Sequence, residues 1–483
     1  MTLTLVERAD ERLSALERLE VLCDPGSIQL IRTQVRSRRM GDKAVEGDGI
    51  LAAAGAVDGR QIFCFAQDPS FAGGSLGEMH ADSVVRVLQL AKRARVPVVG
   101  FIESAGARMQ EGLEGLSGYG RIFFEHVKLS GDVPQISVIC GASAGGGSYA
   151  PALTDFVVMT GRSSMFLTGP GVVAEVMGEN VTAEELGGPK VHERSGVCHM
   201  TAPTEVDAAL LVRDLLDYLP QNSGESSRRW PTVAAPGPNP GDVVPSSQRR
   251  VYDVAQLVAA LVDGGRFQEV SPRYARNVFC AFARLDGRAV GVVANNPHHL
   301  GGVLDADSSQ KAARFVRTCN LFGLPLVVLV DTPGFLPGTK QERAGVIRHG
   351  AKLVYAFAEA TVPRVTLITR KAFGGAFIAM NSKDLGADLV FAWPDAQIGV
   401  MGPDQAVGIV ERRTIAAAAD PAAERERLVR IYARENLSAA AAVADGHIDE
   451  ILWPVDSRPR IAAALASMET AGRVKAAAGN LPL

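Results

Sequence analysis

The stretch Gly141-Ala-Ser-Ala-Gly-Gly-Gly-Ser148 comes directly after the apolar run Ile136–Cys140, and a related stretch, Lys371-Ala-Phe-Gly-Gly-Ala-Phe377, comes directly after the apolar run Val365–Thr369. Short continuous apolar runs are typical of strands that are covered on both faces. In each stretch the chain therefore leaves a buried strand through glycines. Because this strand-to-glycine junction occurs twice, it indicates that the chain contains the same structural unit twice.

The chain is an internal duplication. Gly301 follows Gly73 by 228 positions, and Pro325 follows Pro97 by the same number. Further along, the glycine pair at 374 and 375 follows the pair at 145 and 146 by 229 positions. A spacing that stays this constant over several motifs indicates two copies of one structural unit.

Each copy predicts the same order of elements. A helix comes first, and a strand follows it, at Val98–Ile102 in the first copy and Leu326–Val330 in the second. The strand before the glycines comes next, and a third strand is predicted at Phe156–Met159 or Leu389–Ala392. Strands that alternate with helices through short links predict parallel sheets in an α/β architecture.

The length supports two domains, since 483 residues exceed what one hydrophobic core usually holds. Residues 221–250 are rich in Pro, Gly and Ser and have no hydrophobic period, so they are interpreted as a linker. A long ordered surface loop would mark the same boundary. We expect one domain over residues 1–220 and another over 251–483, the latter ending in a helix over Pro459–Ala478.

Composition excludes several classes of protein. A formal net charge of −3 without a basic block gives no indication of a nucleic-acid partner. No run of about 18 apolar residues predicts a membrane span, and the first 20 residues lack the apolar core of a signal peptide. The six cysteines form no Cys-x-x-Cys pair, and no metal site is expected. These features favour a reduced, cytoplasmic location.

The glycine stretches predict main-chain hydrogen-bond donors. A strand that enters a helix through glycines leaves amides free at the helix start, and an anionic oxygen can approach them without meeting side chains. That arrangement is an oxyanion hole. One glycine pair alone more often serves tight packing, but two at equivalent positions favour a paired site. Neither stretch has the Gly-x-x-x-x-Gly-Lys-Ser/Thr pattern of a phosphate loop. Gly141–Gly145 and Gly73–Gly77 both fit the Gly-x-Ser-x-Gly pattern, but no His lies near Ser143 in the sequence to activate it, so a turn hydroxyl is favoured over a nucleophile.

Long motifs make the chain resemble the carboxyltransferase (β) subunits of biotin-dependent acyl-CoA carboxylases, the propionyl-CoA and acetyl-CoA carboxylase group. The resemblance extends from about residue 20 to 455. The matching stretches are Gly73-Gly-Ser-Leu-Gly-Glu78, Glu103-Ser-Ala-Gly-Ala-Arg-Met-Gln-Glu-Gly112, Ala144–Asp155, Asn295-Asn296-Pro297, Asp331-Thr-Pro-Gly-Phe-Leu-Pro-Gly338, Ile347–Lys352, Lys371–Phe377 and Ile398–Gly402.

The resemblance implies two duplicated domains of the crotonase-like (ClpP/crotonase) spiral fold. It implies a homohexamer, with each active site between the N-terminal domain of one subunit and the C-terminal domain of another. The implied reaction moves the carboxyl group of carboxybiotin to the α-carbon of an acyl-CoA, through a thioester enolate, and gives malonyl-CoA-type products. Because the sequence has no Met-Lys-Met biotinylation site and no recognisable ATP-binding module, biotin would be attached to a separate biotin carboxylase and biotin carrier (α) subunit.

The resemblance also assigns residues. Amides within Gly145, Gly146 and Gly147 would form one oxyanion hole, and those of Gly375 and Ala376 the other. The loop of Ser104, Ala105, Gly106, Ala107 and Arg108 would bind CoA, with Arg108 as a phosphate contact; a surface ion pair is the alternative for its side chain. Gly374, Phe377 and Ile378 would line the biotin side or the acyl pocket.

The chain departs from the family pattern at a few of these positions. Ser143 stands where the family has Cys, and Phe377 replaces a tyrosine. Ile378 stands where many propionyl-CoA enzymes have Asp, which leaves acetyl or longer acyl chains open. Three other functions remain: a biotin-dependent decarboxylase that runs the same half-reaction backwards, a biotin-independent crotonase-type hydratase or isomerase, and a non-catalytic scaffold.

Overall fold

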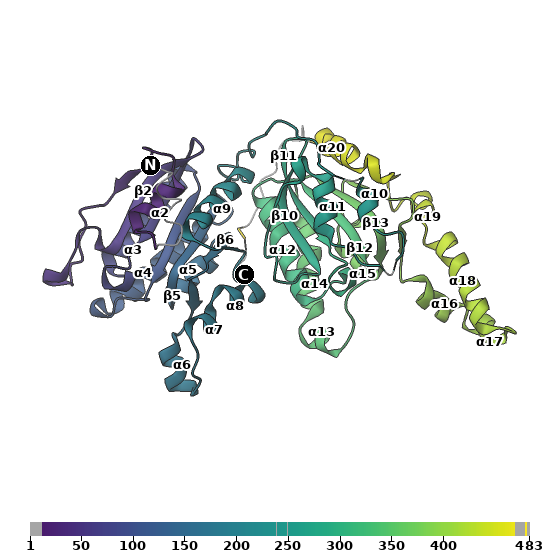
Figure 1. The fold of residues 1–483 in the computed structure, drawn as a ribbon, viewed down its shortest axis with the longest axis horizontal. Helices are drawn as coiled ribbons and strands as arrows, with labels where there is room; N and C mark the ends of the chain where they lie inside the picture. The colour runs from purple at the N-terminus through teal and green to yellow at the C-terminus, as the bar shows by residue number, and fades with distance from the viewer. Residues whose placement is uncertain (1–11, 238, 249, 469–478, 481–483) are drawn as a thin grey trace. The chain divides into compact units, whose positions relative to one another are not determined.

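The computed structural model describes residues 12–237, 239–248, 250–468 and 479–480. The chain forms two compact units (Figure 1): unit 1 comprises Met1–Arg228 with Lys475–Leu483, and unit 2 comprises Arg229–Val474. Residues 1–11, the first part of the stretch considered for a signal peptide, lie outside the described residues. So does 469–478, the second half of the predicted terminal helix. Its first half is helical, as α20 (Ser457–Ser467).

Unit 1 contains one mixed sheet with helices on both faces. Its strands are β1 (Gln29–Ile31), β2 (Ile50–Val57), β3 (Arg60–Gln67), β4 (Val98–Ser104), β5 (Gln135–Ala144), β6 (Phe156–Thr160), β7 (Ser164–Phe166) and β8 (Met200–Ala202). Its α-helices are α2 (Ala15–Leu22), α3 (Glu78–Ala94), α4 (Leu113–Leu129), α5 (Gly146–Ala152), α6 (Pro170–Met177), α7 (Ala183–Gly187), α8 (Pro189–Ser195) and α9 (Glu205–Tyr218).

Unit 2 repeats this plan. Its strands are β9 (Phe267–Glu269), β10 (Val278–Leu285), β11 (Arg288–Asn295), β12 (Leu326–Thr332), β13 (Arg364–Phe373), β14 (Leu389–Ala392), β15 (Gln397–Gly399) and β16 (Glu450–Ile451). The helices before its glycine turn are α10 (Pro240–Val243), α11 (Val254–Leu261), α12 (Ala306–Leu321), α13 (Thr339–Arg343) and α14 (Val346–Glu359). After the turn come α15 (Gly374–Ala379), α16 (Pro403–Val410), α17 (Arg412–Ala417), α18 (Pro421–Asn436), α19 (Ala439–Ala444) and α20.

The two sheets share one topology. The order β2-β3-β4-β5-β6-β8 in unit 1 corresponds to β10-β11-β12-β13-β14-β16 in unit 2, and the short strands β7 and β15 pair with β5 and β13. The central strands from β3 to β6 are parallel, as are those from β11 to β14. The predicted α/β fold with a parallel sheet in each copy is confirmed.

The central strands are buried on both faces because helices cover both. In β4 every residue is buried, and Val98 and Ile102 join the core formed with α3 and α4. Val99 and Phe101 alternate with them and are buried on the other face. The cysteines of the apolar runs, Cys140 among them, are buried free thiols, as expected. Among the described residues, no helix has the length and hydropathy needed to span a bilayer.

Candidate functional site

In unit 1 the chain turns sharply from β5 into α5. Gly145 makes the turn with φ 59° and ψ −123°, a conformation that glycine adopts readily. The Gly145 amide donates to the carbonyl oxygen of Phe166 at 3.1 Å, so it is not an open donor. Within the described chain, the next two amides, of Gly146 and Gly147, have no protein acceptor. The three glycines assigned from the sequence thus divide into one that shapes the turn and two that offer donors.

Unit 2 builds the same turn between β13 and α15. Gly374 has φ 60°, which matches Gly145, and the short helix ends with a bond from the Met380 amide to the Ala376 carbonyl at 3.0 Å. The amides of Gly375 and Ala376 have no acceptor in the described parts of the protein. Gly375 is exposed, and Ile378 projects from the next turn of the helix with 47% of its surface accessible.

An aromatic ring lies against each turn, and the two rings come from different elements. A Cβ built on Gly146 would lie 2.5 Å from the ring of Tyr119 on α4, so no larger residue fits there. A Cβ on Gly375 would lie 3.8 Å from the ring of Phe335, which is ordinary contact. Sequence reasoning missed both rings. The run Gly118-Tyr119-Gly120 was a possible signal, since an aromatic residue between glycines in a helix indicates close packing.

The loop after β4 packs closely on the segment that contains Gly73. Its backbone is held by bonds from the Ala105 amide to Gly73 O at 3.0 Å and from the Leu76 amide to Gly106 O at 2.8 Å. Ser104 is buried, and its hydroxyl accepts from the Gly106 amide at 3.2 Å. Ala105 is exposed and Ala107 half-buried, so these two residues present the loop to solvent.

The structure corrects the expectation for Arg108. Its side chain is fully buried, and its Nη1 bonds to Asp48 Oδ1 at 2.6 Å and Glu111 Oε1 at 2.8 Å. Nη2 donates to the carbonyl oxygens of Asp48 and Ser75. The guanidinium is therefore neither a phosphate contact nor a surface ion pair. Its partner Asp48 lies 60 positions away in the sequence, which is why the motif alone did not reveal it.

Burial affects the two carboxylates of this cluster differently. Desolvation raises the pKa of Asp48, although Arg108 opposes the change. Desolvation also acts on Glu111, but bonds from the Ser37 hydroxyl, the Glu78 amide and Arg108 outweigh it and lower the pKa of Glu111. Arg108 thus compensates two buried acids that hold the loop.

Strands β4 and β12 each carry a buried acidic residue near their carboxyl end. Glu103 ends β4 beside the loop, and its Oε2 accepts from Nη2 of the fully buried Arg18 at 2.7 Å. In unit 2 the residue 228 positions later, Asp331, accepts from Arg370 Nε at 2.9 Å. Both carboxylates are buried and bonded, so they support the loop rather than contact a substrate.

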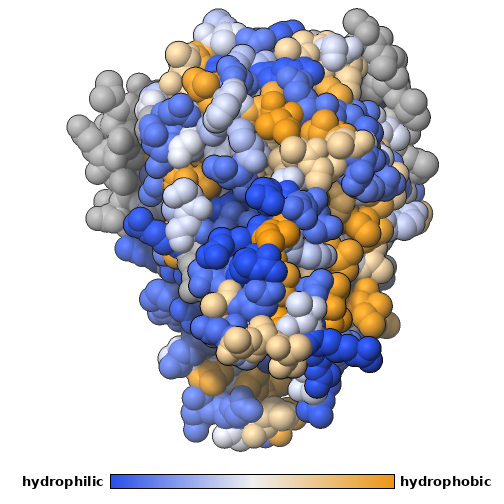
Figure 2. All heavy atoms as spheres, turned by 90° about the vertical axis from the view of Figure 1, so that its right-hand side faces the viewer, coloured by the Kyte–Doolittle hydropathy of each residue, from blue (hydrophilic) through white to orange (hydrophobic). Residues whose placement is uncertain are grey.

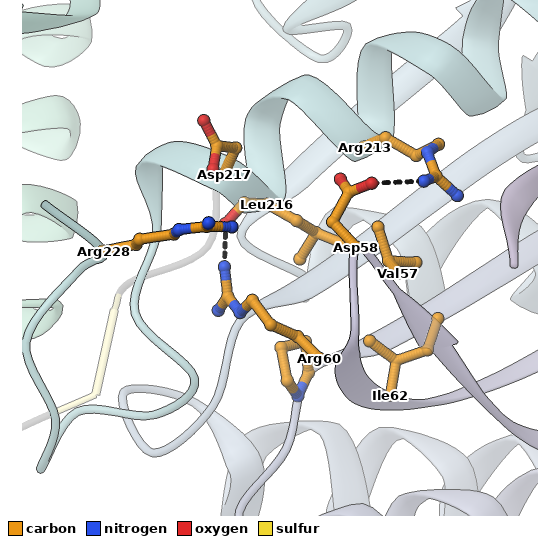
Figure 3. Close-up of a pocket in the computed structure, with 9 residues that line it drawn as sticks. Val57, Asp58, Arg60, Ile62, Arg213, Leu216, Asp217 and Arg228 are labelled. Carbon is orange, nitrogen blue, oxygen red and sulfur yellow. Dashed lines mark hydrogen bonds and ion pairs between the residues drawn. The ribbon is translucent and has the colours of Figure 1, made fainter. Parts of the chain in front are cut away.

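Two cavities of unit 1 lie away from the glycine turn. A space of about 10 Å³ near Arg60 has room for one water at most. There Arg60 donates to the Leu216 carbonyl and Arg213 pairs with Asp58 (Figure 3). It lies at the start of β3, the end of the parallel strands opposite the turn. A cavity of about 440 Å³ beside Glu103 is not lined by Gly145–Gly147 either.

Among the described residues, no cluster of three or more His, Cys, Asp or Glu side chains could hold a metal ion.

We predict that Arg108→Met destabilises unit 1 rather than weakening substrate binding. Removing the cation leaves two buried carboxylates uncompensated, which costs about 3–5 kcal/mol of unfolding free energy. Denaturant unfolding should show this loss, while the exposed control Arg93→Met stays within about 0.5 kcal/mol of wild type. A tenfold rise in the KM for an acyl-CoA at unchanged stability would contradict the structural role.

Comparison with known proteins identifies the family. The carboxyl transferase domain family matches residues 6–480. The propionyl-CoA carboxylase beta chain of Saccharopolyspora erythraea is 45% identical, over 99% of this chain and 92% of that protein. The methylmalonyl-CoA decarboxylase subunit alpha of Veillonella parvula is 43% identical, over 99% and 94%. The crystal structure of transcarboxylase 12S, with methylmalonyl-coenzyme A bound, superposes with a TM-score of 0.93 at 44% identity, covering 99% of this chain and 94% of that one. The chain belongs to the carboxyltransferase family of crotonase-like fold.

Proposed function

We propose that this chain is the carboxyltransferase subunit of a biotin-dependent acyl-CoA carboxylase, acting in the cytoplasm. The observation that carries the proposal is the pair of equivalent turns, each with two adjacent main-chain amides that have no acceptor among the described residues. We further propose that the two units are the N-terminal and C-terminal carboxyltransferase domains, so that each domain contributes one turn.

The donors suit the chemistry of the reaction. Adjacent amides bind a single carbonyl-type oxygen, and they bind it more strongly as negative charge develops on it. An acyl-CoA thioester carries such an oxygen, which becomes anionic in the enolate. Biotin carries another in its ureido ring, and when bound it supplies the carboxyl group. Two turns therefore fit two oxygens, and neither a side-chain nucleophile nor a metal is required of this chain.

Exposed apolar side chains support a site completed by a second copy. In unit 1, Tyr149, Leu167, Val176 and Met177 lie on or after the glycine turn, and their unit 2 counterparts are Ile378, Val400, Ile409 and Val410. All eight are between 47% and 80% exposed. The space-filling view in Figure 2 shows apolar side chains interrupting the hydrophilic surface on the side of unit 2 that carries α16, α17 and α18. Apolar surface of this kind marks an interface.

We therefore propose that unit 1 of one copy and unit 2 of another face each other within a homohexamer. The 12S transcarboxylase relative is described as a hexamer and as a multienzyme core. A biotin carboxylase and biotin carrier subunit would be the other partner. Ala105, which is exposed, and Ala107, which is half-buried, would contact CoA through the loop backbone, with Ser104 and Gly106 shaping that loop.

The acyl group would lie near Ile378, Phe377 and Gly374. Because Ile378 is apolar and exposed beside the donors, it favours acyl chains that extend over it. We propose a tolerant preference from acetyl to longer chains. The methylmalonyl-CoA decarboxylase subunit is 43% identical, against 45% for the propionyl-CoA carboxylase chain, so the same half-reaction run in reverse is the second candidate function.

The proposed activity predicts ATP- and bicarbonate-dependent carboxylation when the chain is combined with a biotin carboxylase and carrier. Acetyl-, propionyl-, butyryl- and longer acyl-CoAs are compared. Ile378→Asp should lower kcat/KM for butyryl-CoA about 10-fold or more relative to propionyl-CoA, since a carboxylate replaces an apolar contact. Ile378→Val is the matched apolar control. Carboxylation of none of these thioesters would refute the proposed function, and an unchanged profile in Ile378→Asp would remove Ile378 from the acyl pocket.

The donor role predicts a sharp difference between two substitutions of Gly375. Gly375→Ala keeps the amide, and its methyl group would lie 3.8 Å from Phe335, so activity should stay within about threefold of wild type. Gly375→Pro removes the N–H, and loss of one oxyanion donor lowers kcat by about 10²–10³. Steady-state kinetics on hexamers verified by light scattering measure the difference. Equal activity of the two variants would exclude the amide as a donor.

A further inference from the structure

Three hydroxyl groups lie directly beneath the donor turn of unit 1. A Cβ built on Gly147 would lie 3.0 Å from Ser143 Oγ and 3.4 Å from Tyr119 Oη. The same point is 3.6 Å from Ser104 Cβ. The three side chains come from β5, α4 and β4 respectively, and each residue is at most 3% exposed. They therefore converge on the side of the turn that faces the interior.

The hydroxyl of Ser143 has no hydrogen-bond partner among the described residues, although the residue is completely buried. Buried polar groups without partners are rare in native proteins and need an explanation. Ser104 and Tyr119 are already linked, because their hydroxyl oxygens lie 3.4 Å apart. The Ser143 hydroxyl is thus the unpaired member of a cluster whose other two members are joined.

Unit 2 shows that the turn can form without this cluster. Ser143 corresponds to Ala372, since Ser104 pairs with Ser143 in register as Thr332 does with Ala372. The ring against the second turn is Phe335, which carries no hydroxyl. Only the hydroxyl that holds the adjacent loop is common to both units: Thr332 accepts from the Gly334 amide at 3.3 Å, as Ser104 does from Gly106. The hydroxyls of Tyr119 and Ser143 are thus specific to the first turn.

We propose that Ser143 and Tyr119 are positioning residues for the carboxyltransferase reaction, and that with Ser104 they hold the Gly146–Gly147 amides in the orientation that receives the developing oxyanion. The proposal rests on the proposed function. The cluster is sealed from solvent, so it acts through the turn and not on the substrate. Burial raises the pKa of Tyr119, which keeps its hydroxyl protonated as a donor. A rigid polar support limits reorganisation of the donors as charge appears.

The test separates a positioning role from a purely structural one. Ser143→Ala removes a hydroxyl that has no partner, so the melting temperature should stay the same or rise. If the cluster positions the donors, kcat should fall about tenfold while the KM for acyl-CoA changes less than about twofold. Tyr119→Phe should give a similar loss, and the double variant should lose no more than either single one, because the cluster acts as a unit. Ser143→Cys keeps a weak donor and should recover part of kcat.

Ser137→Ala is the matched control. Ser137 is a buried serine of the same strand, and its hydroxyl accepts from Thr154 Oγ1 at 3.3 Å, away from the turn. This variant should melt at a lower temperature and keep the kcat of wild type. The positioning role is overturned if Ser143→Ala keeps full kcat while wild type carboxylates acyl-CoA. Failure of wild type to carboxylate any thioester refutes the proposed function instead.

A crystal structure of wild type tests the cluster without relying on activity. It should show one ordered water that joins Ser143 Oγ to Tyr119 Oη, since Ser143 Oγ has no hydrogen-bond partner among the described residues. A Ser143 hydroxyl that donates to a main-chain carbonyl would overturn the cluster.

Discussion

The proposed chemistry depends on one main-chain arrangement: a buried parallel strand enters a short helix through a glycine with φ near 60°. The next two amides have no acceptor in the part of the chain that the structure describes. Positive φ at Gly145 and Gly374 reverses the chain direction within one residue. Of the residues that follow, Gly375 is exposed and Gly146 half-buried, whereas Gly147 and Ala376 are buried. An unsatisfied main-chain donor is a cost in a folded protein, so two equivalent unsatisfied pairs point to an oxygen ligand that satisfies them.

The duplication shows how differently two copies can support the same turn. In unit 1 the acid near the end of β4 is paired with Arg18 of α2, whereas in unit 2 the acid near the end of β12 is paired with Arg370 of the neighbouring strand β13. The ring of Tyr119, on a helix, packs against the first turn, and the ring of Phe335, in a loop, packs against the second. The backbone geometry is retained while the side chains around it have changed, as expected if the donors carry the function and the supports can be exchanged.

The sequence predicted the fold well because its signals are local. Apolar runs and glycine junctions at a constant spacing revealed the strands and the duplication. The limits of the strands were less predictable: β5 continues to Ala144, beyond the apolar run, because its last residues pair with β7, a three-residue strand without an apolar run of its own. Contacts distant in sequence were not predictable. Arg108 was expected to contact phosphate because the family resemblance places its loop at the CoA site, but its side chain is buried and paired with Asp48. The Gly145 amide was excluded as an open donor only by its bond to Phe166.

In the proposed enzyme, the donors of unit 1 in one copy and of unit 2 in another act together in one site. Two inactive variants are mixed, Gly147→Pro in one tagged chain and Gly375→Pro in another, and assemblies that carry both tags are isolated. Gly147 is chosen over Gly146 because an added Cβ there meets the Ser143 hydroxyl at 3.0 Å and not the Tyr119 ring. If a site combines unit 1 of one copy with unit 2 of another, a pair of unlike chains has one doubly damaged site and one intact site, so about half of the wild-type carboxylation activity per pair should return. If doubly tagged assemblies are as inactive as each parent, the two turns do not form one site between copies.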